Sequence, residues 1–251
     1  MRTIAEKILS LISKNYYVYK ASQKIVSFHN NENNPNFASN GESVFLKNYA
    51  PSANVIFDVG ANVGTWTRLT HAHSPQAQIY AFEPFTQAFR ELSAMQLPGS
   101  VHYYNIALGN APEKKNLFTY AESSAFNSLY PRQLGIETSS VSVNVTTLDL
   151  FCTEHAIHNI DFLKIDVEGA ELAVLQGAYD MIAQGKIKVI QFEYGGTYID
   201  AHILLKDIFD FFVHTPYQLY KIFPDQIVPL AQYDPGLENF QYANYAALLK
   251  A

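Results

Sequence analysis

Cysteine is almost absent from this chain of 251 residues, and Cys152 is the only one. No disulfide can form within the chain, which argues against a small secreted protein, so we expect a cytoplasmic location. A lone cysteine of this kind is typically a small, buried, apolar side chain.

Long apolar runs are missing as well. No stretch reaches the ~18 apolar residues that a membrane-spanning helix needs. Near the N-terminus, Glu6, Lys7 and Lys14 interrupt the apolar segment that a signal peptide requires. We therefore expect peripheral contact with a membrane at most.

Positive charge is also scarce, with 17 Lys and Arg against 23 Asp and Glu and a net charge of −6. A broad basic surface for a nucleic acid backbone is excluded on this balance, so we expect no nucleic acid partner. The charge is unevenly distributed. The first 50 residues carry six basic and three acidic side chains, which leaves a net −9 for the rest.

The first 50 residues predict a helical extension. Apolar positions recur at helical spacing over residues 3–28, which indicates one amphipathic helix or a pair. The stretch "HNNENNPN" ends it as a loop, and a second helix is expected over residues 42–49. Packing on its own domain, a homodimer contact and a membrane surface are all open for this extension, and we place the second domain at residues 51–251.

From residue 54 onward, short apolar runs alternate with helical stretches, which indicates an α/β fold with a parallel sheet and crossover helices. A hairpin is expected from the alternation at 114–120 and 141–146, and "YQLYKIF" and "YANYAALL" predict two last strands. We expect the other strands near 54–58, 78–82, 101–106, 160–165 and 187–193, and helices near 64–73, 85–96, 147–156, 170–178 and 201–213.

The stretch "NVIFDVGANVGTWTRL" predicts a strand, a tight turn and a helix, an arrangement that binds ligands at the carboxyl edge of a sheet. A dinucleotide fingerprint would need glycine where Asn62 and Thr65 stand, which weakens an NAD-dependent oxidoreductase. S-adenosylmethionine suits the turn better, with Asp58 available to its ammonium group. Glu83, 25 residues further on, could bind the ribose hydroxyls of either cofactor.

The motifs "FDVGANVGTW", "AFEP", "NIALGN", "TLDLF" and "DFLKIDVEGAELAVLQGA" make the chain resemble the FkbM-type methyltransferases over about residues 54–195. The resemblance implies a class I methyltransferase, with a Rossmann-like seven-stranded mixed sheet whose last strand runs antiparallel between its neighbours. It also implies S-adenosylmethionine as cofactor. The implied cofactor-binding residues are Asp58, Gly60, Asn62, Gly64 and Thr65 of the first motif, Glu83 and Pro84 of the second, Asn105 and Ala107 of the third, and Asp166 of the last.

Acidic residues provide the expected catalytic groups. Asp166 and Glu193 each end a central strand, so they should meet at one edge of the sheet, and Glu168 lies nearby. Such a pair can act as the general base for an acceptor hydroxyl or can hold a divalent cation such as magnesium, and the choice stays open. An orienting role for Asp166 and a structural ion pair for Glu193 also stay open. For Glu171, at a helix start, we expect a structural role.

Histidines and tyrosines offer further candidates. His202 and His214 are rival bases, whereas His71 with His73, and His155 with His158, have ordinary helix positions. Ring platforms for the acceptor could come from Tyr194 and Tyr198.

Together these features predict an S-adenosylmethionine-dependent O-methyltransferase acting on a sugar, glycan or natural-product hydroxyl, with a lipid-linked acceptor included. A non-catalytic cofactor-binding or scaffold protein of the same fold is the alternative.

Overall fold

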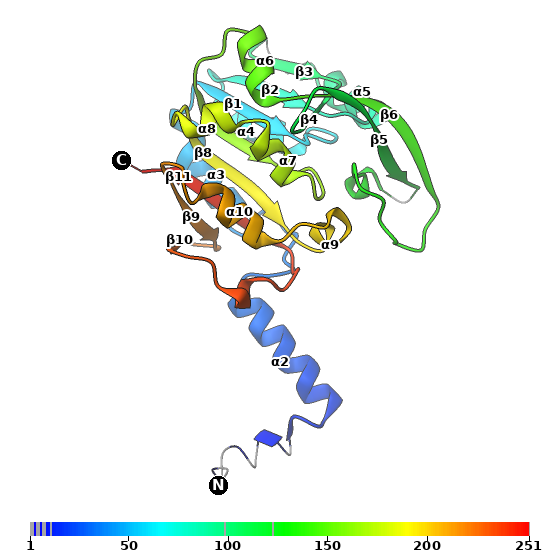
Figure 1. The fold of residues 1–251 in the computed structure, drawn as a ribbon, viewed down its shortest axis with the longest axis vertical. Coiled ribbons are helices and arrows are strands. Elements are labelled where there is room, and N and C mark those ends of the chain that lie inside the picture. Colours follow the sequence, from blue (N-terminus) through cyan, green and yellow to red (C-terminus); the bar gives the residue numbers. More distant parts are fainter. Residues whose placement is uncertain are drawn as a thin grey trace.

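The computed structural model describes residues 3, 6, 9–10, 12–97, 99–121 and 123–250. A packed body contains two sheets, and the helix α2 (Tyr16–His29) projects from it (Figure 1). Residues 4, 5, 7, 8 and 11 of the predicted N-terminal helix lie outside the described part of the chain. None of the helices within the described part is long and apolar enough to cross a bilayer.

The main sheet has eight strands in the order β10-β9-β11-β8-β7-β1-β2-β3. The central strands β1, β2, β3, β7 and β8 run parallel, and β11 is antiparallel to both β8 and β9. The strands are β1 (Val55–Val59), β2 (Gln78–Phe82), β3 (Val101–Tyr104), β7 (Ile160–Ile165), β8 (Ile187–Tyr194), β9 (Tyr217–Ile222), β10 (Ile227–Leu230) and β11 (Ala243–Leu249).

The predicted α/β fold is confirmed, including the antiparallel last strand, but the predicted count of seven strands is wrong. The eighth strand, β10, pairs only with β9 at the edge of the sheet. It contains Pro229, which an edge strand tolerates because its missing N–H leaves no inner partner unpaired. The proline made this segment look like a loop in the sequence.

A second sheet of three strands, in the order β4-β6-β5, lies beside the main one. The expected hairpin forms from β5 (Glu113–Tyr120) and β6 (Thr138–Thr146), and β4 (Ala107–Leu108) adds a short parallel pairing to β6. The predicted strand 101–106 therefore ends at Tyr104, and the chain passes from the main sheet to the second one. Residues 121–137 connect β5 to β6 and are called the β5–β6 loop below.

Helices cover both faces of the main sheet. On one face α6, α7, α8 and α10 pack on a core that includes Phe57, Leu163 and Ile190; on the other, α3 and α4 pack on Ile56 and Phe162. The helices besides α2 are α3 (Glu42–Tyr49), α4 (Thr65–His73), α5 (Thr86–Ala94), α6 (Leu148–Glu154), α7 (Glu171–Gln176), α8 (Tyr179–Ala183), α9 (Thr197–Ala201) and α10 (Leu205–Phe212), with short 3-10 turns η1 (Ala50–Ser52), η2 (Ser124–Phe126) and η3 (Pro235–Leu237).

Two predicted helices differ from the observed ones. The helix expected at 201–213 is split into α9 and α10, because His202 ends α9 in a left-handed conformation with φ of 55°. The helix expected at 170–178 ends at Gln176, and a separate short helix, α8, follows it.

Residues 31–50 belong to the body rather than to an appendage. The Glu32 carboxylate is paired with Lys221 at 3.1 Å, and Glu42 accepts a hydrogen bond from Gln191 of β8 at 2.9 Å, all within the protein interior. Phe45 of α3 is buried against the sheet. The boundary predicted at residue 50 therefore lies inside one packed unit, and α2, with the described residues before it, extends beyond that unit.

Candidate active site

The turn after β1 is held against the ends of two neighbouring strands. The backbone N–H groups of Gly60 and Ala61 donate to the Phe82 carbonyl at 3.0 and 2.9 Å. Gly60 has φ of 82°, and a Cβ there would lie 1.8 Å from the backbone oxygen of Asp166. Only glycine can occupy this position, because the turn is wedged against the end of β7.

Gly64 lies at the start of α4, where there is no room for a side chain. It precedes α4 with φ of 84°, and a Cβ on it would lie 2.1 Å from Met95 and 2.7 Å from Leu92. Its function is the close packing of α4 against α5. Neither Gly64 nor Thr65, the first residue of α4, is among the residues that line the cavity described below.

Glu83, which follows β2, faces the cavity with both carboxylate oxygens already bound to backbone N–H groups. Oε2 accepts from Asn62 and Oε1 accepts from Phe85, each at 2.8 Å. Burial raises the pKa of Glu83 to about 7, although these two donors oppose the shift. Asn62 has φ of 48°, so the turn presents its N–H group directly to the acid.

Asn105 supports this wall from behind. Its side-chain amide donates to the carbonyls of Glu83 and Pro84 at 2.8 and 3.0 Å. Pro84 and Ala107 line the cavity and Asn105 does not, so the structure shows a positioning role for Asn105 and its adenine contact stays a prediction.

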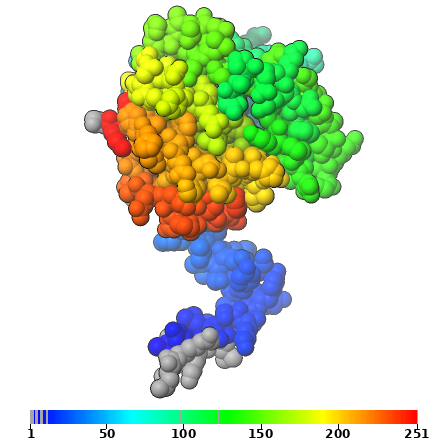
Figure 2. Space-filling view, in the orientation of Figure 1, coloured from blue at the N-terminus to red at the C-terminus, as the bar shows by residue number. Residues whose placement is uncertain are grey.

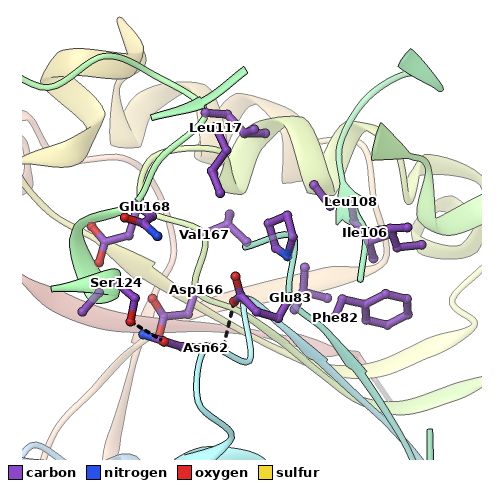
Figure 3. Close-up of a pocket in the computed structure, with 17 residues that line it drawn as sticks. Asn62, Phe82, Glu83, Ile106, Leu108, Leu117, Ser124, Asp166, Val167 and Glu168 are labelled. Carbon is purple, nitrogen blue, oxygen red and sulfur yellow. Dashed lines mark hydrogen bonds between the residues drawn. The ribbon is translucent and has the colours of Figure 1, made fainter. Parts of the chain in front are cut away.

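The cavity opens between the carboxyl ends of β1, β2 and β7 and the second sheet (Figure 3). Its empty space is about 710 Å³ with the open mouth included. One end is apolar and the other carries carboxylates. Its lining consists of Val59, Gly60, Asn62, Phe82, Glu83, Pro84, Ile106, Ala107, Leu108, Leu117, Ser124, Ala125, Asn127, Leu129, Asp166, Val167 and Glu168.

This lining fits S-adenosylmethionine. Apolar side chains from Phe82, Ile106 and Leu108 suit an adenine ring, and Glu83 offers carboxylate oxygens to ribose hydroxyls. At the other end, Asp166 and Glu168 favour a positively charged group such as a sulfonium.

Asp58, by contrast, does not reach the cavity. Its side chain is fully buried, accepts a hydrogen bond from Thr67 at 2.6 Å, and lies 3.6 Å from the Lys164 ammonium. Burial raises the pKa of Asp58, and Lys164 opposes that shift. The structure thus places Asp58 in an ion pair beneath the turn, and its contact with the cofactor, directly or through a bridging water, stays a prediction. A lysine inside the apolar run "DFLKI" was the sequence signal for this pairing.

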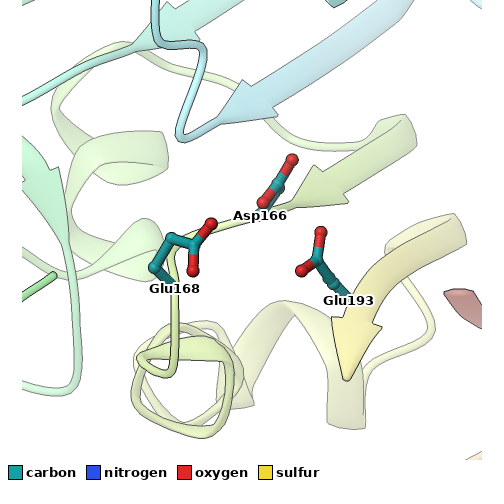
Figure 4. Close-up of side chains that lie close together, drawn as sticks. All are labelled: Asp166, Glu168 and Glu193. Atoms are coloured by element: carbon teal, nitrogen blue, oxygen red, sulfur yellow. The ribbon is translucent and has the colours of Figure 1, made fainter. Parts of the chain in front are cut away.

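Asp166, Glu168 and Glu193 converge at one edge of the main sheet, as Figure 4 shows. Each offers a carboxylate oxygen, and the three oxygens lie within 4.8 Å of one another. Asp166 follows β7, Glu193 lies near the end of β8, and Glu168 is presented from the turn between them with φ of 53°. The predicted meeting of Asp166 and Glu193 at one edge is confirmed.

Two of these three acids are neutralised by cations. The Lys164 ammonium contacts Asp166 at 3.0 Å, and the Arg132 guanidinium contacts Glu168 at 3.1 Å. Among the hydrogen bonds and ion pairs of the described residues, none reaches the Glu193 carboxylate. Burial, reinforced by the charges of Asp166 and Glu168, raises the pKa of Glu193 well above its ordinary value.

Glu171 has the structural role expected of it. Its two carboxylate oxygens accept the N–H groups of Val167 and Gly169, each at 3.0 Å, and thereby hold the turn that carries Glu168. Burial raises the pKa of Glu171 to about 8.

The β5–β6 loop forms an outer wall of the cavity, which the sequence analysis did not predict. Ser124 donates to the Asn62 side-chain oxygen at 2.8 Å, and Ser128 donates to the Glu168 carbonyl at 2.6 Å. Arg132, in the same loop, also lies 3.6 Å from Asp200 of α9. The density of short polar residues in "SSAFNS" was the available signal, because such side chains bind backbone and turns.

The rival bases and ring platforms lie elsewhere. Within the described residues, the cavity lining and the acid cluster contain no histidine. Tyr194 is buried and donates to Glu238 at 2.9 Å, while Tyr198 is buried and donates to the Glu193 carbonyl at 3.0 Å. Both rings therefore belong to the core and do not form an exposed platform.

An open α/β sheet with an antiparallel last strand, a left-handed turn after β1 and an acid after β2 is the arrangement found in class I S-adenosylmethionine-dependent methyltransferases. A sequence model of the methyltransferase FkbM domain matches residues 58–218, and the chain belongs to that family.

Individual relatives are more distant. The chain is 30% identical over 151 residues to "Methyltransferase 1" of Beauveria bassiana, a match covering 52% of this chain and 60% of the relative. It is 26% identical over 155 residues to 31-O-demethyl-FK506 methyltransferase FkbM of Streptomyces tacrolimicus, covering 50% of this chain and 60% of the relative. The crystal structure of methyltransferase FkbM from Methylobacillus flagellatus KT aligns with a TM-score of 0.49 at 15% identity, over 77% of this chain and 43% of that one.

Proposed function

We propose that this methyltransferase acts on a hydroxyl of a small-molecule or glycan acceptor, with Glu193 as the general base. The carrying observation is that Glu193 is the one acid of the cluster without a cation or donor among the described residues. The name of the Streptomyces relative describes an O-methylation substrate, which supports oxygen as the acceptor atom here.

The chemistry requires alignment of the acceptor oxygen and removal of its proton. When bound, the cofactor supplies an electrophilic methyl group on a sulfonium, which becomes a thioether as the methyl group leaves. Asp166 lines the cofactor cavity, and Glu193 lies beside it but outside the lining, so an acceptor oxygen near Glu193 would adjoin the cofactor's charged end. Glu193 accepts the acceptor's proton, and its raised pKa makes it a stronger base than an ordinary glutamate.

The two cations near the acid cluster pair with the other two acids and leave Glu193 free to accept a proton. Lys164 pairs with Asp166 at 3.0 Å, and Arg132 pairs with Glu168 at 3.1 Å, where the guanidinium opposes the rise in the pKa of Glu168 that burial causes. Their remaining negative charge favours the cationic end of the cofactor, while Glu83, Asn62 and the apolar end of the cavity hold the nucleoside.

A magnesium ion at the acid cluster stays a prediction, because the three carboxylates provide suitable oxygen ligands but two of them, Asp166 and Glu168, are paired with cations. Turnover that survives removal of divalent cations by a chelator would favour Glu193 acting directly. The cytoplasmic location also stays a prediction.

The test measures cofactor binding and turnover separately. Calorimetric titration with S-adenosylmethionine and with its demethylated product should show binding, and turnover should be detected across a panel of sugars and polyketides bearing free hydroxyls. Binding with no turnover on any such panel, and no difference between the wild type and Glu193→Gln, would support the scaffold alternative. Binding of a nicotinamide dinucleotide in preference would refute the cofactor.

A further inference from the structure

Helix α2 is the one long helix that the body does not cover. It spans 14 residues, and within Tyr16–His29 no side chain is buried (Figure 2). Apolar and aromatic side chains are nevertheless abundant on it, and the exposed fractions reach 81% for Tyr17, 69% for Ile25 and 89% for Phe28. Exposed apolar surface of this extent marks an interaction site.

One side of the helix is predominantly apolar, although Tyr16, Tyr19 and Val26 lie on the other side. At ~100° per residue, Tyr17, Val18, Ala21, Ile25 and Phe28 share one side. Lys20 and Lys24 follow next around the helix, beside Tyr17, where long side chains can bury their carbon stems along an apolar surface and keep the ammonium groups in water.

Charge distinguishes this helix from the body. The sequence contains no Asp or Glu between Glu6 and Glu32, whereas Lys7, Lys14, Lys20 and Lys24 fall in that interval. The residues after position 50 carry a net −9. An anionic partner is therefore attracted to α2 and repelled by most of the body.

The length of α2 restricts how it could meet a bilayer. Fourteen residues at ~1.5 Å each give about 21 Å, shorter than the ~30 Å hydrocarbon core. A basic helix with one apolar side and this length suits the plane of the membrane interface.

We propose that α2 docks the protein onto an anionic lipid surface, with Tyr17, Ile25 and Phe28 inserted and Lys20 and Lys24 contacting the headgroups. A symmetric pairing of α2 with the same helix of a second copy would bring like-charged lysines together with no acid on α2 to offset them. The lipid surface instead matches both the charge and the apolar side.

The segment that follows α2 is hydrogen-bonded to the body, so docking of the helix would also position the body. Just after the helix, Asn31 donates to the Ile222 carbonyl at 3.1 Å, and the Asn33 N–H donates to the Tyr242 carbonyl at 2.8 Å. These contacts tie the helix to the segments of β9 and β11, so a docked α2 holds the body at the surface rather than through a loose tether.

Vesicle flotation tests the proposal with the full chain. Vesicles of equal phosphatidylglycerol and phosphatidylcholine should bind the wild type, and pure phosphatidylcholine should bind at least about tenfold less. The Ile25→Glu/Phe28→Glu and Lys20→Glu/Lys24→Glu variants should each lose at least about tenfold in binding to the anionic vesicles. Val213→Glu, an exposed apolar position on the body, is the matched control and should bind as the wild type does.

Circular dichroism and titration with the demethylated cofactor should show that all three variants fold. No flotation of the wild type, or equal flotation with both lipids, would overturn the proposal. A dimer in analytical ultracentrifugation that the Ile25→Glu/Phe28→Glu variant dissolves, without vesicle binding by the wild type, would assign α2 to a second copy instead. None of these readouts depends on turnover, so the proposed reaction is tested independently.

Discussion

The carboxylates on the two walls of the active site differ in their hydrogen-bond and ion-pair partners. On the cofactor wall, Glu83 has each carboxylate oxygen bound to a backbone N–H, and Asn105 holds the carbonyls of the same segment. On the acid edge, Asp166 and Glu168 each have a cation, while Glu193 has neither a cation nor a donor among the described residues.

This difference separates binding from chemistry. A carboxylate that is already hydrogen-bonded is fixed in place and suits recognition, because its orientation does not change when a ligand arrives. A carboxylate without donors, crowded by like charges, holds a proton more strongly and suits proton transfer. The comparison predicts that substitutions on the two walls affect different measured quantities.

The largest effect should come from Glu193→Gln, which removes the base while keeping the shape of the side chain. We expect kcat to fall by about 10²–10⁴-fold, the usual contribution of a general base, with unchanged affinity for the demethylated cofactor. Turnover assays and calorimetry on the same preparation measure both. Glu154→Gln, an exposed acid at the end of α6, is the control. A kcat within a few-fold of wild type would remove Glu193 from the mechanism.

Gly60→Ala should disturb the contact between the turn after β1 and the end of β7. Its Cβ would overlap the Asp166 backbone oxygen at a φ that other residues resist, so we expect a loss of stability of ~3 kcal/mol or more and weaker cofactor binding. Thermal unfolding and calorimetry measure the two effects. Gly99→Ala is the control, since a Cβ there meets nothing within 4 Å. Equal unfolding temperatures for both variants would contradict the wedged turn.

Glu83→Gln should affect binding more than turnover. One of the two backbone N–H groups loses its acceptor, which costs ~1–3 kcal/mol and should weaken cofactor affinity by about 10–100-fold. Because burial raises the pKa of Glu83 to about 7, wild-type affinity should also weaken as the pH falls below about 7, when the acid takes up a proton. Calorimetry across this pH range should show the dependence in the wild type and its loss in the variant. A fall in kcat at unchanged cofactor affinity would contradict the binding role of Glu83 and indicate a role in the reaction itself.

The smallest effect is expected from Arg132→Gln, and its sign is the informative part. Wild-type kcat/KM should rise with pH as Glu193 loses its proton. Removing the guanidinium raises the pKa of the neighbouring acids, since a nearby cation favours the ionised form, so the rising limb should move to higher pH. Pre-steady-state or steady-state rates across pH measure it, with Arg132→Lys expected to restore the wild-type profile in part. A shift to lower pH would contradict the assignment.

The sequence predicts the parts of the site that depend on chain order. Apolar runs identify the strands, and the carboxyl ends of parallel strands meet at one edge, so Glu83, Asp166 and Glu193 could be placed there without a structure. The hydrogen bonds from backbone N–H groups to Glu83 and the positive φ values of the turn are harder to predict from the positions of glycine and asparagine.

Contacts between residues far apart in the chain could not be predicted from the sequence. Asp58 and Lys164 are register partners on β1 and β7, and they form a buried ion pair that the sequence analysis did not predict. Arg132 reaches Glu168 only because the β5–β6 loop folds back over the cavity, and no local pattern specifies that return. Glu32 and Glu42 likewise had no partner that the sequence could predict, and Lys221 and Gln191 lie opposite them in the structure.

The contact of Gly60 with the Asp166 carbonyl also limits how this enzyme can diversify. A displacement of the end of β7 that makes room for a new acceptor would also displace the turn after β1. The acceptor side and the cofactor turn therefore cannot change independently. New acceptor ranges are then most easily reached through the β5–β6 loop, whose side chains can be exchanged while that joint stays intact.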